Sequence, residues 1–298
     1  MNNRASQSHF VSGVIICLFG AVFFSTKAVV VKLAYRDTTV DAVTLLALRM
    51  VFSLPFFVVS AWMSSRKSDN VRFTSKQWIG VALVGCLGYY VSSLLDFLGL
   101  QYISAGIERL ILFVYPTLVL LISALIFRKK IKPIQWIAVA VTYAGLILAF
   151  FGEATINTNT PAFYLGSALI FGCAITYALY IVGSGRLIPI VGASKFNSYA
   201  MSFACLAVLL HFFITSDQSL FNLDKMVYGY SMTMALVGTV IPSYLVTEGI
   251  KRIGSDNAAI VGSVGPVSTI LQAHFFLSEP ILATQIAGTA LILAGVLI

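Results

Sequence analysis

Residues 10–34 read FVSGVIICLFGAVFFSTKAVVVKLA, and the only charged residues among them are Lys27 and Lys32. A helix of about 20 apolar residues crosses the hydrocarbon core of a bilayer, so this run is long enough to do so. The apolar region of a secretory signal peptide is shorter, and no persuasive cleavage site follows here. The run therefore predicts a first membrane span and not a cleaved leader.

The composition of the whole chain extends this interpretation. Of its 298 residues, 59% are hydrophobic and only 10% are charged, whereas a soluble domain carries about 25% charged residues. The mean hydropathy is +0.93. These values argue against a water-soluble enzyme, a nucleic-acid-binding protein and a disordered regulator. The net charge of +8 is then a matter of membrane topology, because basic residues collect in cytoplasmic loops.

Ten apolar segments of suitable length follow one another along the chain, and no connection between them is long enough to form a soluble domain. We therefore expect an all-α membrane protein with ten transmembrane helices. The predicted spans are residues 10–34, 41–63, 76–101, 105–127, 133–151, 162–183, 195–214, 226–250, 256–277 and 280–298.

The lysines and arginines predict which way these spans face. Thirteen of them fall on the side that holds the N-terminus, and four fall on the other side. The positive-inside rule therefore places both termini in the cytoplasm. The thirteen are Arg4, Arg66, Lys67, Arg72, Lys76, Arg128, Lys129, Lys130, Lys132, Arg186, Lys195, Lys251 and Arg252; the four are Lys32, Arg36, Arg109 and Lys225.

The second half of the sequence repeats features of the first at a fixed offset, which relates Gly99 to Gly249. Each half, residues 1–151 and residues 152–298, then holds five spans. Because five is odd, the two halves must cross the membrane in opposite orientations, as in many secondary transporters. Further aligned pairs are Pro116 with Pro266, Gln135 with Gln285 and Gly145 with Gly295.

Two motifs make the chain similar to the drug/metabolite transporter superfamily, in its EamA-like branch of ten-span bacterial carriers. Residues 99–106, GLQYISAG, run into Pro116; residues 255–259, SDNAA, run through Pro266 to the Ser-Glu-Pro of residues 278–280. The first half departs from the family pattern, because residues 128–130 are Arg-Lys-Lys where a Gly-Glu pair is common. The resemblance implies a bacterial inner-membrane exporter. It also implies a central cavity lined by spans 1–4 and 6–9, with spans 5 and 10 at the periphery.

Small residues lie seven positions apart in spans 5 and 10: Ala138 with Gly145, and Gly288 with Gly295. Seven residues are about two helical turns, so each pair forms one smooth stripe that another helix can approach closely. The stripe fits packing against a neighbouring span of the same chain. A homodimer through spans 5 and 10 is the alternative, so the sequence leaves both a monomer and a homodimer open.

Five ionisable residues fall inside predicted spans: Lys27, Arg49, Asp96, Glu108 and Arg109. Each costs at least about 2.5–3.5 kcal/mol in hydrocarbon unless it faces a partner or a cavity. Their depths, counted from the span ends along the helical rise, place all five in the half of the membrane away from the cytoplasm. We expect Lys27, Asp96, Glu108 and Arg109 to form a gate or coupling network, and Arg49 to contact the substrate.

Hydroxyl-bearing side chains are candidates for the rest of a binding site. Tyr89 and Ser93 share the face of Asp96 at helical spacing in span 3. Span 6 carries Tyr177 and Tyr180, and span 8 carries Tyr244. These aromatic and hydroxyl groups suit a small amphipathic solute, although simple packing is an alternative role for each of them. The candidate substrate-binding residues are Arg49, Tyr89, Ser93, Tyr177, Tyr180 and Tyr244.

Pro116 and Pro266 lie near the middles of spans 4 and 9. A proline removes one helical hydrogen bond and frees the carbonyl four residues before it, here at Leu112 and Gly262. In lipid such a carbonyl needs a partner or a wet cavity. Because the two prolines are equivalent in the repeat, we expect hinges beside the binding site; incidental kinks are the alternative.

The sequence carries no motif for catalysis, nucleotide binding or metal binding, so we expect no cofactor and no enzyme activity. The four cysteines are isolated in apolar runs, as buried cysteines are. We expect a secondary transporter that exports amino acids or related metabolites by alternating access. The alternatives are an importer or exchanger of a nucleoside, an amine or a drug-like cation, and a membrane-embedded enzyme acting on lipids. Proton coupling, with Asp96 as the candidate site, and facilitated diffusion both stay open.

Overall fold

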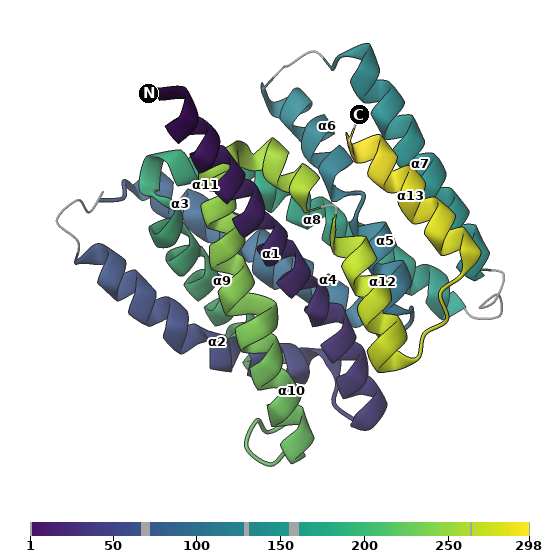
Figure 1. Ribbon diagram of the computed structural model, residues 1–298. Coiled ribbons are helices and arrows are strands. Elements are labelled where there is room, and N and C mark those ends of the chain that lie inside the picture. Colours follow the sequence, from purple (N-terminus) through teal and green to yellow (C-terminus); the bar gives the residue numbers. More distant parts are fainter. Residues whose placement is uncertain (1, 67–71, 128–130, 155–160, 263, 298) are drawn as a thin grey trace.

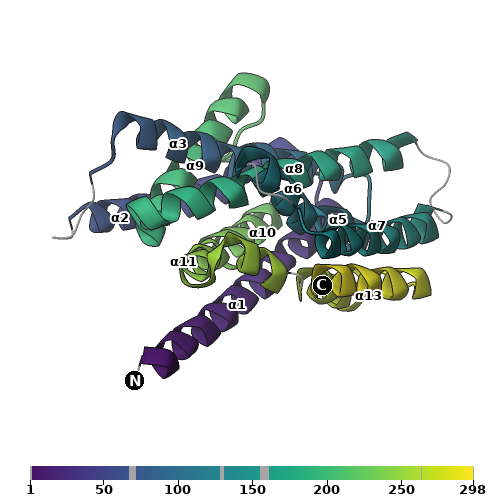
Figure 2. The ribbon, with the colours of Figure 1, turned by 90° about the horizontal axis from the view of Figure 1, so that it is seen from above.

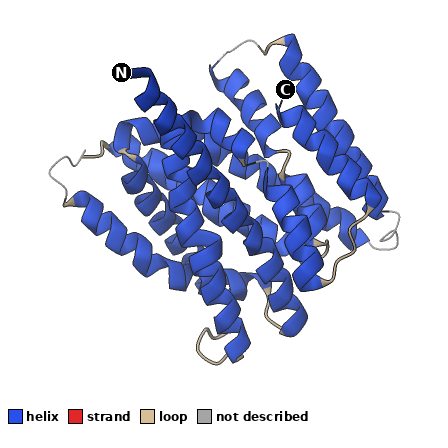
Figure 3. Cartoon of the chain, viewed as in Figure 1, coloured by secondary structure: helices blue, strands red, loops and turns tan. Residues whose placement is uncertain are grey.

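The computed structural model describes residues 2–66, 72–127, 131–154, 161–262 and 264–297, and every regular element within these ranges is helical (Figure 3). Four of the basic residues used for the orientation, Lys67 and residues 128–130, lie outside them. The first half holds α1 (Asn2–Asp37), α2 (Ala42–Ser65), α3 (Ser75–Gly85), η1 (Cys86–Val91), α4 (Ser92–Gly99), α5 (Ala105–Leu112), α6 (Tyr115–Phe127) and α7 (Pro133–Ala154). The second half holds α8 (Pro161–Val191), α9 (Ala193–Thr215), α10 (Lys225–Ala235), η2 (Leu236–Val240), α11 (Ile241–Val261), α12 (Val264–Leu277) and α13 (Ala283–Leu297).

Eight stretches in the described part of the chain are long and apolar enough to cross a membrane, and two shorter apolar helices cover Pro133–Ala149 and Ala283–Gly295. These ten stretches fall on the ten predicted spans, so the chain is an all-α membrane protein. Several boundaries differ from the prediction, most of all in spans 6 and 10. The helix of span 6 continues through Pro189 to Val191, and span 10 begins at Ala283, because its Pro280 belongs to the connection before it.

Polar residues between the apolar runs decide where several helices begin. The Asp41 carboxylate accepts hydrogen bonds from the backbone of Val43 and Thr44, at the start of α2. Thr74 forms a capping box with Gln77 at the start of α3. The side chains of Ser104 and Asp224 each accept one backbone N–H hydrogen bond, from Ile107 at the start of α5 and from Met226 at the start of α10. Such caps satisfy backbone N–H groups that a helix leaves unpaired at its first turn.

The helices are interrupted at matching places in the two halves. The π-helical segments η1 and η2 begin at Cys86 and Leu236, two positions that the repeat aligns with each other. A break at Phe113 and Val114 separates α5 from α6, and Gly262 ends α11 at the equivalent place. A second interruption, at Gly254, has φ 81°, a left-handed conformation that glycine adopts without strain.

Pro116 and Pro266 lie directly after these breaks and not in the middle of a continuous helix; their role as hinges stays a prediction. Pro116 is the second residue of α6, and Pro266 is the third residue of α12. A helix has no acceptor for the N–H groups of its first turn, so proline is tolerated there. The bends in spans 4 and 9 therefore arise because one helix ends and another begins.

Helices of the two halves pack against each other through the middle of the molecule (Figure 1). α1 runs along α11 and α12, and α2 packs on α9. α7 and α13 form a separate pair at one side, which is also distinct when the molecule is seen from above (Figure 2). The two termini lie toward the same end of the bundle in Figure 1, as an even number of crossings requires.

The small-residue stripes of spans 5 and 10 face each other within the chain. A Cβ atom at Gly145 would lie 2.6 Å from the Gly288 carbonyl oxygen, and one at Gly288 would lie 2.6 Å from the Gly145 carbonyl oxygen. One at Gly295 would lie 2.7 Å from the Ala138 carbonyl oxygen. Close packing inside one chain therefore accounts for the stripes. A homodimer through these spans would have to use their other, exposed faces.

Candidate functional site

A cavity of about 70 Å³ lies between the two halves, and α1, α2, η1, α4, α5, α6, α8, α11 and α12 all contribute to its wall. Its charged lining residues are three cations, Lys27, Arg49 and Arg109. The aromatic lining residues are Phe24, Tyr89, Phe113, Tyr115 and Tyr177.

Many lining residues are related to one another by the offset of the repeat. The residue in the first half is charged or large, and its counterpart in the second half is uncharged and, in most pairs, smaller. Equivalent positions of the two halves thus line one cavity with side chains of different charge and size. The pairs are Lys27 with Tyr177, Arg109 with Ala259, Leu112 with Gly262, and Tyr115 with Gly265.

Lys27 of α1 and Asp96 of α4 form a buried ion pair. The Lys27 Nζ lies 2.7 Å from Asp96 Oδ2, and 11% of the lysine side chain and none of the aspartate side chain is exposed. Lys27 also lines the cavity, whereas Asp96 is not a lining residue and lies behind Lys27. The cation thus stands between the cavity and the carboxylate. The contact fits the expected gate, whose function stays a prediction.

Arg49 of α2 lines the cavity, and its side-chain hydrogen bonds go to hydroxyl groups. Its Nε donates to Thr239 Oγ1 at 2.6 Å, and its Nη1 donates to Ser93 Oγ at 3.3 Å. The guanidinium carbon lies 5.4 Å from the centroid of the Phe97 ring, a cation–π distance. The residue is 1% exposed, and no carboxylate of the described residues lies within ion-pair distance of it.

Arg109 of α5 has a similar environment. Its Nε donates to Thr269 Oγ1 and its Nη2 to Ser25 Oγ, both at 3.0 Å. Its sequence neighbour Glu108 is fully buried, and the Glu108 carboxyl lies within hydrogen-bonding reach of the Asp96 carboxyl. The structure therefore brings all five predicted intramembrane charges into one cluster, which we call the charged layer: Lys27, Arg49, Asp96, Glu108 and Arg109.

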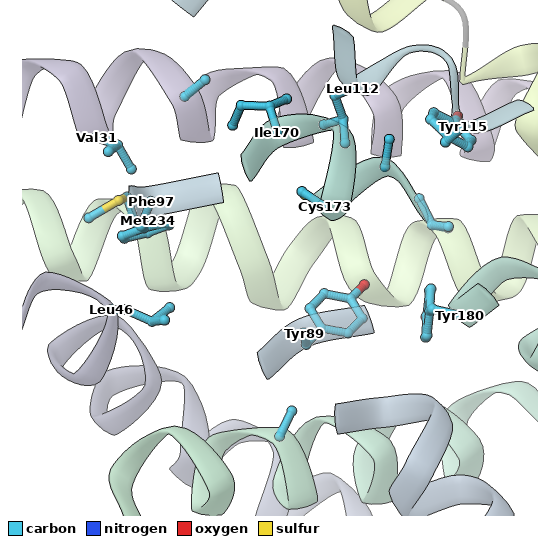
Figure 4. Close-up of a cluster of buried hydrophobic side chains, with 14 of the residues drawn as sticks. Val31, Leu46, Tyr89, Phe97, Leu112, Tyr115, Ile170, Cys173, Tyr180 and Met234 are labelled. Carbon is cyan, nitrogen blue, oxygen red and sulfur yellow. The ribbon is translucent and has the colours of Figure 1, made fainter. Parts of the chain in front are cut away.

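The tyrosines predicted to bind substrate separate into two groups. Tyr89 and Tyr177 line the cavity, and Ser93 lines it beside Arg49. Tyr180 is fully buried outside the lining, with its ring 5.1 Å from that of Tyr89 and 5.7 Å from that of Tyr177. Figure 4 shows the Tyr89 and Tyr180 rings side by side. Tyr180 therefore supports the cavity wall from behind.

Tyr244 also lies outside the cavity lining. Its hydroxyl is 3.0 Å from Ser198 Oγ, and its ring is 5.8 Å from the Phe57 ring. It joins α11 to α9 and α2. The structure thus assigns a packing contact to Tyr244 and to Tyr180, and neither enters the proposed substrate site below.

Sequence reasoning missed several residues that complete the site. Ser25, Thr239 and Thr269 hold the two guanidinium groups, and Tyr115 lines the cavity. The repeat held a usable signal for one of these residues, because it aligns Thr239 with Tyr89. Serine and threonine are otherwise common in membrane helices, where they bond their own backbone, so nothing in the sequence distinguished Ser25 from the rest.

Contacts between the halves lie at both ends of α1. Near its C-terminal end, the Glu279 carboxylate accepts hydrogen bonds from the backbone N–H groups of Ala105 and Gly106, at 3.1 and 3.3 Å. Near its N-terminal end, Arg252 Nη1 donates to Ser12 Oγ at 2.8 Å. The cavity lies between these two sets of contacts.

Comparisons with known proteins agree with this architecture. The profile of the EamA-like transporter family matches residues 11–151 and 164–298. The chain is 32% identical to the uncharacterized transporter YcbK of Bacillus subtilis, over 93% of this chain and 89% of that protein. It is 22% identical to the uncharacterized transporter sll1319 of Synechocystis, over 94% of this chain and 90% of that protein.

A crystal structure of another protein shares the fold. The TM-score is 0.68, the identity is 18%, and the likeness covers 96% of this chain and 94% of the other. At this identity the likeness concerns the fold alone. The family match extends over nearly the whole sequence and the relatives bear the names of transporters. The chain is therefore a membrane transporter of small solutes and not an enzyme, and it belongs to the EamA-like transporter family.

Proposed function

We propose that this chain is a secondary transporter that exports amino acids or related metabolites bearing a carboxylate across the bacterial inner membrane. The observation that carries the proposal is the cavity between the halves, whose charged lining residues are all cations. A guanidinium presents its donors in a planar fork that fits a carboxylate. Export, as opposed to uptake, follows the resemblance to the family.

The two arginines are the groups that a substrate carboxylate would meet. Lys27 already has Asp96 as its counterion, whereas the described partners of Arg49 and Arg109 in the cavity wall are hydroxyl groups. Neither guanidinium forms an ion pair with a described carboxylate, and a buried cation is stabilised by an anion in direct contact, so an incoming carboxylate is stabilised here. A solute that carries only an amine or another cation would be repelled, and a neutral nucleoside would leave both guanidinium groups unused.

The aromatic lining suits the apolar part of such a solute. Phe24, Tyr89, Tyr115 and Tyr177 bring ring faces and hydroxyl groups to the same space. Pockets for drug-sized ligands measure about 300–1,000 Å³, far more than the 70 Å³ found here. Loading therefore requires the halves to move apart, as in alternating access between inverted repeats.

Counterflow in proteoliposomes tests this function. Vesicles loaded with unlabelled amino acids are diluted into each carbon-14-labelled amino acid in turn, with a nucleoside and a quaternary amine as further probes and protein-free vesicles as the control. We expect transient accumulation of at least one labelled amino acid, recovered chemically unchanged. Accumulation of only the nucleoside or the amine would overturn the carboxylate assignment, and a chemically altered solute would indicate an enzyme.

A further inference from the structure

We propose that Asp96 and Glu108 form a proton-binding site in which the two carboxyl groups share one proton, and that this site is linked to the cavity through Lys27. The proposal deepens the transport function, and it rests on that function only for the identity of the anion that enters the cavity. The proton site itself follows from the buried charges.

The two carboxyl groups meet in the interior of the bundle. Asp96 comes from α4 and Glu108 from α5, and both residues are fully buried. Each carboxyl lies within hydrogen-bonding reach of the other. Because an ionised carboxylate has no donor, a hydrogen bond between two carboxyl groups needs a proton on one of them. Two ionised carboxylates in contact would repel strongly in this medium.

The surrounding groups decide which carboxyl keeps the proton. Lys27 contacts Asp96 at 2.7 Å, which favours the ionised form of Asp96. None of the four carboxyl oxygens of Asp96 and Glu108 accepts a hydrogen bond from a donor of the described residues, and Lys27 forms an ion pair with Asp96 and not with Glu108. Glu108 is therefore assigned the proton and donates it to Asp96. The other titratable or charged groups that face the pair are Tyr35 of α1, Arg49 of α2, Arg109 of α5 and Cys173 of α8.

The hydrogen-bond donors nearby are engaged elsewhere. The Arg109 guanidinium donates to Ser25 and Thr269, and the Tyr35 hydroxyl donates to the Phe97 carbonyl at 2.9 Å. A structural lock would need Lys27 and one carboxylate only. A second buried acid adds an insertion cost of a few kcal/mol, and a proton on that acid supplies the hydrogen bond that offsets it.

Lys27 connects this pair to the cavity. One side of Lys27 contacts Asp96 and the residue also lines the cavity. A carboxylate that enters the cavity attracts Lys27, so the hold of Lys27 on Asp96 weakens and the pair binds its proton more tightly. Linkage is reciprocal, so protonation of the pair strengthens carboxylate binding. Binding of the proton and binding of the anion therefore favour each other.

Infrared spectroscopy of the purified full chain in lipid nanodiscs tests the site without any substrate. We expect the carbonyl stretch of one protonated carboxylic acid at neutral pH, which is lost in Glu108→Gln. Glu248→Gln is the matched control, because Glu248 forms a partly exposed ion pair with Arg252. Asp96→Asn also removes one carboxyl of the pair and should alter the carbonyl band. It replaces Glu108→Gln as the test variant if Glu108→Gln does not fold.

Acetate and methylammonium probe the linkage, because both are small enough for the cavity. Acetate should move the midpoint of the carbonyl titration to higher pH, by about one unit for a tenfold linkage, and methylammonium should not. A spectrum without a protonated carboxyl at neutral pH, or a band that both Glu108→Gln and Asp96→Asn leave intact, would overturn the site. A midpoint that acetate leaves in place would overturn the linkage. Neither result depends on the counterflow experiment, so failure of the transport proposal is recognised separately.

Discussion

Lys27 and Tyr177 line the same cavity from equivalent positions of the two sequence repeats, one in α1 and the other in α8. The same relationship joins Leu112 to Gly262. All five members of the charged layer, however, belong to the first half of the chain. The two halves thus share positions around the cavity, while the first half supplies the charges and the second supplies aromatic and small residues.

The ion pair between Lys27 and Asp96 predicts strong non-additivity. Lys27→Met and Asp96→Leu should each lower the yield of folded protein, because removal of one partner of a buried pair costs about 3–5 kcal/mol. The double variant should recover the yield and much of the transport. Detergent-extracted yield and counterflow are measured side by side. A double variant with a yield no better than either single variant would contradict the pairing. The partly exposed ion pair of Glu248 and Arg252 is the control, because such a pair contributes at most about 1 kcal/mol to stability.

Arg49 should contribute to the binding of carboxylates in particular. Arg49→Gln keeps a hydrogen-bond donor for Thr239 and removes the charge, so we expect affinity for a transported amino acid to fall about 10- to 100-fold, the equivalent of a charge-assisted hydrogen bond. Competition counterflow measures this. Arg66→Gln is the control, because Arg66 is exposed and stacks on Trp62, 4.0 Å from its ring centroid. Equal affinity in wild type and Arg49→Gln would remove Arg49 from the site.

The α7–α13 contact should not tolerate a side chain at Gly145. Gly145→Leu places atoms where the Gly288 carbonyl lies, 2.6 Å from a Cβ at this position, so the thermal stability of the purified protein should fall sharply. Ala144→Leu is the matched control, since Ala144 is exposed next to it. Similar melting temperatures for the two variants would show that α7 and α13 do not pack as described.

The helix breaks in spans 4 and 9 should control turnover. Gly262→Ala brings a Cβ against the Tyr115 hydroxyl, so it should slow exchange about tenfold, close to 1.4 kcal/mol in the barrier. Pro116→Ala and Pro266→Ala should act in the same direction, because they allow the helices to extend across the breaks. Pro189→Ala, exposed in α8, is the control. Normal rates in all three site variants would make the breaks purely architectural.

The orientation predicts which loops an impermeant reagent can reach. After the native cysteines are replaced, single cysteines at Ser68 and Lys130 should be shielded from a membrane-impermeant thiol reagent added to whole cells, whereas one at Asn157 should react. Permeabilised cells give the full labelling of each site. Reaction of Ser68 from outside would reverse the topology.

The sequence by itself determined that the chain is a helical membrane protein and where its spans lie. Hydrocarbon excludes unpaired backbone groups, so an apolar run of about 20 residues has one stable form, and local composition suffices to find it. The same cost makes intramembrane charges rare, so Lys27, Arg49, Asp96, Glu108 and Arg109 stood out from the sequence alone. The internal repeat likewise marked equivalent positions before any contact was known.

Only the tertiary structure decided which of these residues meet. Tyr177 and Tyr180 lie three positions apart on one helix, yet one lines the cavity and the other packs behind Tyr89, because neighbouring helices cover different faces. Arg49 donates a hydrogen bond to Thr239, 190 residues away, and Arg109 donates one to Thr269, 160 residues away. Such contacts depend on how whole helices pack, and periodicity within a single helix carries no information about its partner.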